Sequence, residues 1–318
     1  MSMCRRPIQH AGLLCVLYEC AWVEESHRGF YYDATMARVN HPADRLCEAI
    51  DRAGVPLCVG IDPVQERLPK ELQEQNPLDA VATFCKGVID SVKVHAAAVK
   101  FQSACFERYG AKGVALLGDL RQTASDAGLI VILDAKRGDI GISAKHYAAA
   151  ATADGPCDFI TVNPYLGMDG VIPFLDAGLG VFCLIRTSNP SGDSIQKQSL
   201  QDGRTVAQSI ADLLNKAGKP YIGAMGWSSL GAVVGATNPE EAIVLRKHMP
   251  HQMFLLPGIG AQGGRVEDVA PCFADGHGAL VSASRSVIYA ATEESNWQKA
   301  IEQAAGNLAN DLLVGKTA

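Results

Sequence analysis

The alternation of short apolar segments with helical segments constrains the fold of this chain more than any other feature. Eight runs rich in aliphatic residues end in polar residues, Gly or Pro, and most of the segments between them have the apolar spacing of amphipathic helices. The expected strands are Val55–Pro63, Val94–Phe101, Leu129–Lys136, Asp158–Tyr165, Gly180–Thr187, Tyr221–Gly226, Met253–Gly258 and Ala279–Ser284. The expected helices that alternate with them are Leu78–Val92, Gly113–Ala127, Ala144–Ala153, Gly170–Ala177, Thr205–Ala217, Pro239–Lys247, Val266–Ala274 and Ser295–Leu313. This order predicts an α/β fold, a single-domain (β/α)8 TIM barrel, with a Rossmann-like open sheet as the alternative.

The first 38 residues do not share this pattern. They contain Arg5-Arg6 and a short apolar patch, but no sustained period of 3.6 or 2 residues. We therefore expect residues 1–38 to form an N-terminal extension and residues 39–318 to form the barrel domain. A signal peptide is the alternative, although acidic residues follow the patch closely and no small-residue cleavage site stands out.

Charge and cysteine usage narrow the possible partners. The net charge is −6 and Lys and Arg are spread through the sequence, which argues against binding to polymeric nucleic acid. No apolar run reaches about 18 residues, so no membrane span is expected. The ten cysteines are scattered singly and none forms a C-x-x-C pair. We expect free thiols in a reducing cytoplasm and no zinc site.

A barrel places function at the carboxyl ends of its strands, and the third expected strand ends in an unusual set of charges. Asp134 and Lys136 lie two residues apart, so they project from the same side of a strand. Asp139 follows Gly138, and whether it faces the same pocket depends on the turn or on a neighbouring subunit. A solvated Asp–Lys pair in a strand-to-helix turn is the simpler explanation of this spacing.

Two segments near the C-terminus predict a phosphate site. The glycine-rich stretch 257–264 follows the seventh expected strand, and Ser284-Arg285 follows the eighth. In barrels these two loops frequently bind phosphate through backbone N–H groups and an arginine. Plain turns are the alternative. The long polar segment 187–203, after the fifth strand, is either a lid over a ligand or a surface loop.

The residues that could perform chemistry at these strand ends are lysines and aspartates. The eight histidines avoid the strand ends, except for His95 at the start of its strand, and no Ser-His-Asp or Cys-His set converges there. Neither a histidine general base nor a histidine metal site is therefore indicated.

Six motifs, in order along residues 40 to 315, closely resemble the orotidine 5′-phosphate decarboxylase family, in its branch with the long D-A-K-R-G-D-I form. They are Cys58–Pro63, Val99–Gln102, Asp134–Gly141, Arg186–Pro190, Pro257–Gly264 and Ser284-Arg285. The resemblance implies decarboxylation of orotidine 5′-monophosphate (OMP) to uridine 5′-monophosphate (UMP), the last step of UMP biosynthesis. It also implies a cytoplasmic homodimer with shared active sites that uses no cofactor and no metal.

The resemblance also implies roles for individual residues. The catalytic array would be Lys100, Asp134, Lys136 and Asp139, in which Lys136 protonates C6 of the pyrimidine and Asp139 acts across the dimer interface. The implied substrate-binding residues are Asp62, Gln102, Ile140, Ser143, Thr187, Ser188, Pro257, Gln262, Ser284 and Arg285. Among these, Asp62 with Lys100 matches the ribose contacts, Gln262 with Arg285 the phosphate contacts, and Thr187 with Ser188 the ring edge. Gln102 and Ser143 stand where some members have Asn and Thr.

Two other functions remain open on the sequence alone. Relatives with the same Asp-x-Lys-x-x-Asp core decarboxylate keto-sugar phosphates, or act as aldolases on them, with Mg²⁺. Such an enzyme needs a further acidic ligand, and the strand ends offer only Asp62. A non-catalytic barrel that binds a pyrimidine nucleotide is the other alternative, although all four charged positions are intact.

Overall fold

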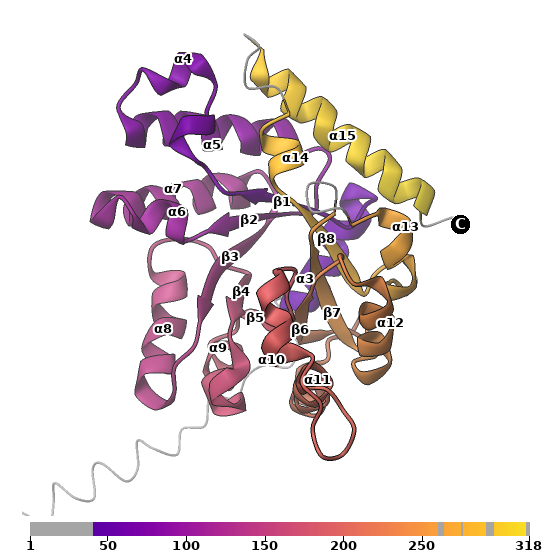
Figure 1. Ribbon diagram of the computed structural model, residues 1–318. Helices are drawn as coiled ribbons and strands as arrows, with labels where there is room; N and C mark the ends of the chain where they lie inside the picture. Colours follow the sequence, from indigo (N-terminus) through magenta and orange to yellow (C-terminus); the bar gives the residue numbers. More distant parts are fainter. Residues whose placement is uncertain (1–40, 260–263, 275, 291–295, 316–318) are drawn as a thin grey trace, which may run out of the picture. The chain divides into compact units, whose positions relative to one another are not determined.

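A closed barrel of eight parallel strands forms the centre of the protein. The structure, a computed structural model, describes residues 41–259, 264–274, 276–290 and 296–315, which belong to one compact unit, Asn40–Ala318. The strands are β1 (Leu57–Ile61), β2 (Ala98–Gln102), β3 (Ile130–Arg137), β4 (Phe159–Val162), β5 (Gly180–Arg186), β6 (Ser228–Val234), β7 (Gln252–Pro257) and β8 (Ala279–Ala283). They pair in sequence order, and β8 pairs with β1 to close the barrel (Figure 1). The predicted (β/α)8 fold is therefore confirmed.

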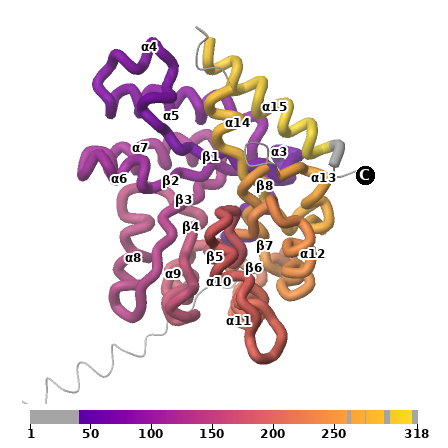
Figure 2. Tube along the Cα trace, in the orientation of Figure 1, coloured from indigo at the N-terminus to yellow at the C-terminus, as the bar shows by residue number. Residues whose placement is uncertain are grey.

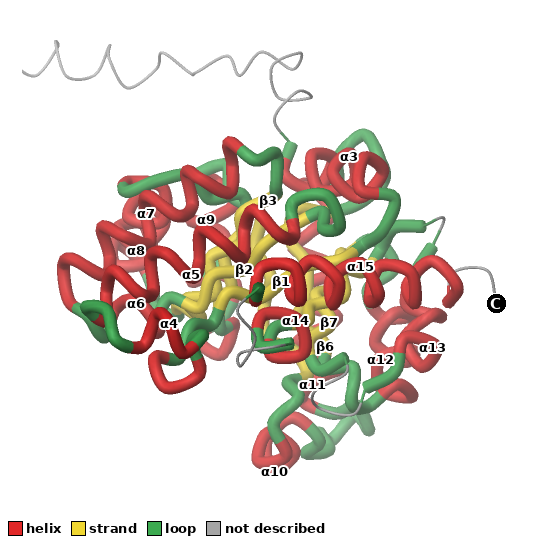
Figure 3. Tube along the Cα trace, turned by 90° about the horizontal axis from the view of Figure 1, so that it is seen from above, coloured by secondary structure: helices red, strands yellow, loops and turns green. Residues whose placement is uncertain are grey.

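Helices surround the strands on the outside of the barrel, as the view from above shows (Figure 3). They are α3 (Pro42–Ala53), α4 (Lys70–Gln73), α5 (Pro77–Val92), α6 (Ala104–Glu107), α7 (Gly110–Asp126), α8 (Gly141–Ala153), α9 (Ile172–Asp176), α10 (Asp193–Gln196), α11 (Val206–Gly218), α12 (Pro239–His248), α13 (Val266–Val269), α14 (Arg285–Ile288) and α15 (Trp297–Gly315). The trace passes from strand to helix around the ring, so the last helix, α15, packs beside α5 (Figure 2).

Each strand has one face toward the helices and one toward the barrel interior. In β3, Val131 and Leu133 belong to the outer apolar cluster, whereas Ile130 and Ile132 belong to the inner one. The inner cluster also contains Phe159 of β4, whose ring stacks on a neighbouring strand's Phe182 at 4.8 Å between centroids. The interior is therefore a packed core. Residues that continue the inner set toward the strand ends must emerge at the mouth.

Helix α3 covers the amino-terminal end of the strands. Its buried face, which includes Leu46 and Ile50, belongs to the inner apolar cluster. The Asp44 carboxylate accepts hydrogen bonds from the backbone N–H groups of Ala224 and Met225, and so ties α3 to the loop before β6. With this end closed, the opposite end is the one that can hold a ligand.

The sixth strand lies later than the sequence pattern predicts. Residues Tyr221–Gly226 are mostly a loop, and β6 is Ser228–Val234. Gly226 has a φ of +82°, which turns the chain before the strand begins. The predicted position was wrong because β6 starts with two serines that are buried through long-range hydrogen bonds: Ser228 bonds to the carbonyl of Gly218, and Ser229 to His41.

Two smaller differences concern element boundaries. The second strand was expected to begin at Val94, but residues 94–97 precede β2, and Val94 is exposed. The expected helix Val266–Ala274 is shorter as α13, and a 3-10 turn, Ala270–Cys272, follows it with Pro271 inside. The expected extension, residues 1–38, lies outside the described residues.

All seven cysteines in the described part of the chain are free, as expected: Cys47, Cys58, Cys85, Cys105, Cys157, Cys183 and Cys272. Among the described helices, none has both the length and the apolar character needed to cross a bilayer.

Candidate active site

A chain of ion pairs lies at the carboxyl ends of β2 and β3. The Lys100 ammonium donates to Asp134 Oδ2 at 2.7 Å, and the Lys136 ammonium donates to Asp134 Oδ1 at 2.5 Å. Asp62, just after β1, places its Oδ1 4.0 Å from the same Lys100 nitrogen. The structure therefore brings together four of the charged residues that the sequence singled out.

The alternation of side chains along the strands explains this convergence. Asp62, Lys100 and Asp134 each continue the inward-facing set of their strand, whose members Cys58, Ala98 and Ile132 are buried in the inner apolar cluster. The strand register pairs Gly60 with Lys100 and Gln102 with Asp134, so the carboxyl ends lie level with one another. Local pattern and barrel geometry together produce the array.

The backbone around Lys136 departs from regular strand geometry. Lys136 has a φ of +45°, the only positive φ among the described residues other than glycine, and the β3–β4 register shifts between Leu133 and Arg137. Such a bulge redirects a side chain, and a left-handed conformation costs a non-glycine residue about 1 kcal/mol or more. The Lys136 N–H donates to Thr161 Oγ1 at 2.9 Å, which holds this conformation.

Thr161, on β4, fixes the other side of the array. Its hydroxyl donates to Asp134 Oδ1 at 2.8 Å while it accepts from the Lys136 backbone. Thr161 lies in a strand that was predicted from the sequence, but no role was predicted for it. A usable signal was present, because Thr161 is the one polar residue within the β4 run Phe159–Val162 and it shares the inward face with Phe159.

The charges of the array differ in their exposure to solvent. The side chains of Asp134 and Lys100 are each 8% exposed, whereas that of Lys136 is 45% exposed. Burial alone would raise the pKa of Asp134, but Lys100 and Lys136 outweigh it and lower that pKa to about 2. Burial would lower the pKa of Lys100, but Asp134 and Asp62 raise it above its usual value. Asp134 and Lys100 are thus held in their charged forms, and Lys136 is the most exposed of the three side chains at the open mouth.

Three adjoining cavities occupy the mouth. One of about 210 Å³ is lined by the array and by Thr161, Leu184, Thr187, Ser188, Asn189, Val233, Leu255 and Pro257. A second, of about 180 Å³, is lined by Asp62, Lys100, Pro257, Gly258, Ile259, Ser282, Ser284 and Arg285. A third, of about 580 Å³, is lined by Ser188, Asn189, Pro190, Asp193, Thr237, Asn238 and Arg285. Lys100 and Pro257 line both the first and the second cavity, and Arg285 lines both the second and the third. A largely apolar pocket beside the array therefore adjoins polar space around Arg285.

The expected phosphate region is described in part. Ser284 and Arg285 lie where β8 gives way to α14, and Arg285 lines two of the cavities. Gly60 faces Ser284 so closely that a Cβ at this position would collide with the Ser284 side chain, so only glycine fits there. Gln262, the other expected phosphate contact, lies outside the described residues.

Four expected site residues do not line the three mouth cavities. Gln102 reaches Asp134 only through a long contact of 3.5 Å. Asp139 Oδ1 accepts a hydrogen bond from the Ile140 backbone N–H, and the Ile140 side chain is exposed. Ser143 is half-buried in the first turn of α8. Asp139, Ile140 and Ser143 follow the bulge along the chain, just before or within the first turn of α8.

Two polar residues of the mouth were not predicted from the sequence, because the expected sixth strand lay too early in the chain. Thr237 and Asn238 follow the true β6 and line the 580 Å³ cavity beside Arg285. Across the described ranges, no three His, Cys, Asp or Glu side chains are grouped so that they could hold a metal ion.

The fold and the site define a (β/α)8 barrel with a Lys–Asp–Lys array at its catalytic end. A sequence model of the Orotidine 5′-phosphate decarboxylase / HUMPS family matches residues 55–300. The chain belongs to this family.

Individual relatives agree with this assignment. The chain is 43% identical over 300 residues to an orotidine 5′-phosphate decarboxylase from Rhodopirellula baltica, which covers 86% of this chain and 99% of the relative. It is 39% identical over 255 residues to the Clostridium perfringens protein of the same name, covering 78% and 88% of the two chains. Among solved structures, Leishmania donovani OMP decarboxylase is similar with a TM-score of 0.72 and 32% identity, covering 87% of this chain and 99% of that one. A putative orotidine 5′-phosphate decarboxylase from Streptomyces avermitilis gives 0.75 and 33%, covering 87% and 96%.

Proposed function

We propose that this chain decarboxylates OMP to UMP, the last step of de novo UMP biosynthesis, with no metal or organic cofactor. The observation that carries the proposal is the array in which Lys100 and Lys136 both bond to the buried Asp134. Membership in the family, and the printed name of the relative that is 43% identical, support the same reaction.

The reaction needs a fixed cation next to C6 of the pyrimidine. When the bond from C6 to the carboxylate breaks, CO₂ leaves and the electron pair stays on C6, where no π-system or cofactor delocalises it fully. The Lys136 ammonium can stabilise that carbanion and then donate a proton from Nζ to C6. Because its side chain is 45% exposed, Lys136 can regain a proton from solvent.

Asp134 keeps the array ready for this step. Its pKa of about 2 means that it stays ionised at neutral pH, so its carboxylate holds both lysine side chains in place. Repulsion between Asp134 and the substrate carboxylate is a second contribution, which we regard as smaller than preorganised stabilisation of the carbanion.

The remaining expected residues would grip the non-reacting parts of the nucleotide. Asp62 and Lys100 line the 180 Å³ cavity and suit the ribose hydroxyls, and Arg285 suits the phosphate. Thr187 and Ser188 line the 210 Å³ cavity and suit the edge of the ring. Binding energy from the phosphate end can then help to assemble the reactive geometry at C6.

A decarboxylation assay tests the proposal directly. Purified protein is mixed with OMP, and loss of the orotate chromophore is followed with and without EDTA. We expect equal turnover in both conditions, with UMP as the product. Turnover that EDTA abolishes would favour the Mg²⁺-dependent relatives, and UMP binding without any turnover would favour a non-catalytic nucleotide-binding barrel.

We further propose that two copies of the chain share their active sites. Asp139 lies beside exposed apolar side chains on two adjoining segments, Ile140 and Ile142 at the start of α8, and Tyr165 and Leu166 after β4. These segments are neighbours, because the Asn163 N–H donates to the Arg137 carbonyl at 2.7 Å and a Cβ on Gly138 would lie 3.4 Å from Asn163. An apolar patch of this kind suits a self-complementary interface, and it would place Asp139 at the partner's mouth.

Mixing two inactive variants tests the shared site. Lys136→Ala and Asp139→Ala chains each lack one member of the array, and we expect each homodimer to have little activity. Subunit exchange would create hybrid dimers with one intact site, so the mixture should recover part of the wild-type turnover. If exchange is demonstrated with labelled subunits and no activity returns, the shared site is wrong.

The cellular location is also a proposal. We expect the cytoplasm, and the seven free cysteines of the described residues support a reducing compartment.

A further inference from the structure

Arg186, at the end of β5, anchors the segment that follows it. Its side chain is buried, yet each of its three nitrogens has a partner: Nε donates to Glu241 of α12 at 2.5 Å, and Nη2 donates to Asp193 of α10 at 2.6 Å. Nη1 donates to the amide oxygen of Gln196 at 3.2 Å. Helix α10 is thereby fixed against α12 and the barrel wall.

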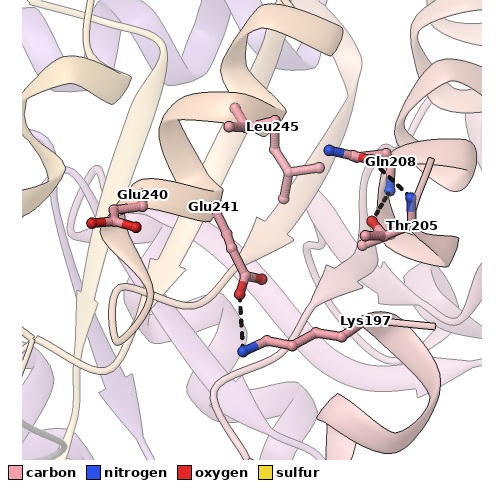
Figure 4. A pocket seen from close by; sticks show the side chains of 8 residues that line it. Lys197, Thr205, Gln208, Glu240, Glu241 and Leu245 are labelled. Carbon is pink, nitrogen blue, oxygen red and sulfur yellow. Dashed lines mark hydrogen bonds and ion pairs between the residues drawn. The ribbon is translucent and has the colours of Figure 1, made fainter. Parts of the chain in front are cut away.

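Lys197 adds a second link between the same two helices. Its ammonium lies 3.1 Å from Asp193 Oδ2 and 3.0 Å from Glu241 Oε1, and the latter pair is drawn in Figure 4. Lys197 lines a cavity of about 360 Å³ together with Glu241 and other residues of α12 and with residues at the start of α11. These links hold α10 in position without help from Gln196.

Gln196 makes a different set of contacts, which converge on Thr187. Its Oε1 accepts a hydrogen bond from the Thr187 backbone N–H at 2.9 Å, and its Nε2 donates to Thr187 Oγ1 at 2.8 Å. Thr187 lines the cavity that contains the Lys–Asp–Lys array. Gln196 therefore makes two hydrogen bonds to Thr187, a residue of the proposed ring-binding pocket.

The orientation of the Gln196 amide follows from its partners. Its oxygen faces two groups that can only donate, the Thr187 N–H and the Arg186 guanidinium. The NH₂ group must then be the part that faces Thr187 Oγ1. Because the Thr187 hydroxyl oxygen already accepts this bond, its own proton is left to donate elsewhere, and in the described residues it has no acceptor.

Close packing keeps this arrangement in place. A Cβ on Gly192 would come within 2.9 Å of Thr187 Oγ1, and a Cβ on Gly235 within 3.1 Å of the Ser188 backbone. The Gly235 N–H also donates to the carbonyl of Arg186 at 2.7 Å. The Thr187–Ser188 edge is thus held between the loops that follow β5 and β6.

We propose that Gln196 is a specificity-determining positioning residue, which makes the Thr187 hydroxyl a hydrogen-bond donor to a carbonyl on the pyrimidine ring edge. This inference rests on the proposed function, because it concerns the same nucleotide pocket. A hydroxyl whose proton is free to donate matches the carbonyl of uracil, whereas the amino group at the same position of cytosine leaves that proton without an acceptor. Gln196 itself is not among the residues that line this cavity.

Replacement by glutamate separates hydrogen-bond direction from packing. In Gln196→Glu, one carboxylate oxygen can still accept from the Thr187 N–H and Arg186, but the other can only accept from the Thr187 hydroxyl. The hydroxyl then becomes an acceptor toward the ring. Gln196→Ala removes both contacts. Gln198→Glu is the matched control, since Gln198 is exposed nearby and its side chain has no hydrogen bond among the described residues.

The experiment measures the dissociation constants of UMP and CMP by calorimetry for each protein. We expect the preference for UMP over CMP to fall about 10-fold in Gln196→Glu and several-fold in Gln196→Ala, and to stay unchanged in the control. In a Thr187→Val background, which lacks the hydroxyl, Gln196→Glu should no longer alter the preference.

The outcomes distinguish this inference from the proposed function. If the wild-type chain does not decarboxylate OMP, the proposed function and the inference built on it both fail. If it does, but Gln196→Glu and Gln196→Ala keep the wild-type preference while their melting temperatures match that of wild type, only the inference is overturned. Equal weakening of UMP and CMP binding would likewise overturn it, because that result indicates a merely structural role.

Discussion

Two buried aspartates on neighbouring strands show how the two ends of this barrel differ. Asp134, near the carboxyl end of β3, and Asp158, just before β4, are each only 6% exposed. Asp134 is bonded to two lysines and a threonine at the mouth. Asp158 accepts from the Val131 backbone N–H and pairs with Arg45 of α3 at the closed end.

Equal burial has opposite consequences for the two carboxyls. Burial is the largest influence on both, and it raises the pKa of Asp158 despite the Val131 N–H and Arg45. At Asp134 the two lysines overcome burial and bring the pKa to about 2. Arg45 is 39% exposed, so solvent weakens its attraction to Asp158, whereas Lys100 is nearly as buried as Asp134 itself. Asp134 therefore differs from Asp158 in having a second cation, and in having one, Lys100, that is buried with it.

The largest expected effect is on enzymatic activity, and it should differ sharply between the two aspartates. Asp134→Asn leaves Lys100 buried with Asp62, at 4.0 Å, as its remaining ion-pair partner among the described residues, and removes the anion that holds Lys136. We expect kcat/KM for OMP to fall by at least about 10³-fold, or about 4 kcal/mol, in this variant. Asp158→Asn should stay within about 2-fold of wild type. A comparable loss in both variants would mean that the array acts through barrel stability.

The next effect, of about 2 kcal/mol, concerns acid stability. Folding lowers the pKa of Asp134 from its ordinary 3.8 to about 2, so its contribution is complete above about pH 4 and is lost as the pH falls toward 2. The raised pKa of Asp158 acts in the opposite direction, because the folded state takes up this proton first and gains stability as the pH falls.

Urea unfolding between pH 6 and 3 measures this difference. We expect Asp134→Asn to lose less unfolding free energy than wild type on acidification, and Asp158→Asn to lose more. If the unfolding free energies of the two variants fell in parallel as the pH was lowered, other titrating groups would dominate the loss of stability in acid.

The sequence was sufficient for the features that depend on local pattern. The inward position of Lys100 and Asp134 follows from strand alternation, and the barrel follows from the order of the elements. The position of β6 could not be found in this way, because its first residues are serines that are satisfied by a helix end and by His41, 188 positions away. Contacts of such separation leave no local periodicity.

The finer geometry of the site was beyond sequence reasoning for a related reason. The bulge that gives Lys136 its positive φ depends on the hydroxyl of Thr161 on the next strand. The orientation of Gln196 likewise depends on Arg186, ten residues earlier, and on the docking of α10 against α12. Spacing can predict which residues meet, but it does not predict which atom donates.

The smallest expected effect concerns the contribution of the Arg45–Asp158 ion pair, at the closed end of the barrel, to the unfolding free energy. Arg45→Met removes the only cation paired with Asp158 among the described residues, while it keeps an apolar stem of similar length. At pH 7 we expect the unfolding free energy to fall by about 1 kcal/mol, because a partly exposed ion pair contributes little. The loss should be smaller at a lower pH, because the raised pKa of Asp158 lets its carboxyl take up a proton there. Arg52→Met, on the same helix with a bond to the Gly128 carbonyl, is the matched control and should show no such pH dependence. If Arg45→Met lost the same unfolding free energy at both pH values, the contribution of Arg45 would come from packing of its side chain and not from its charge.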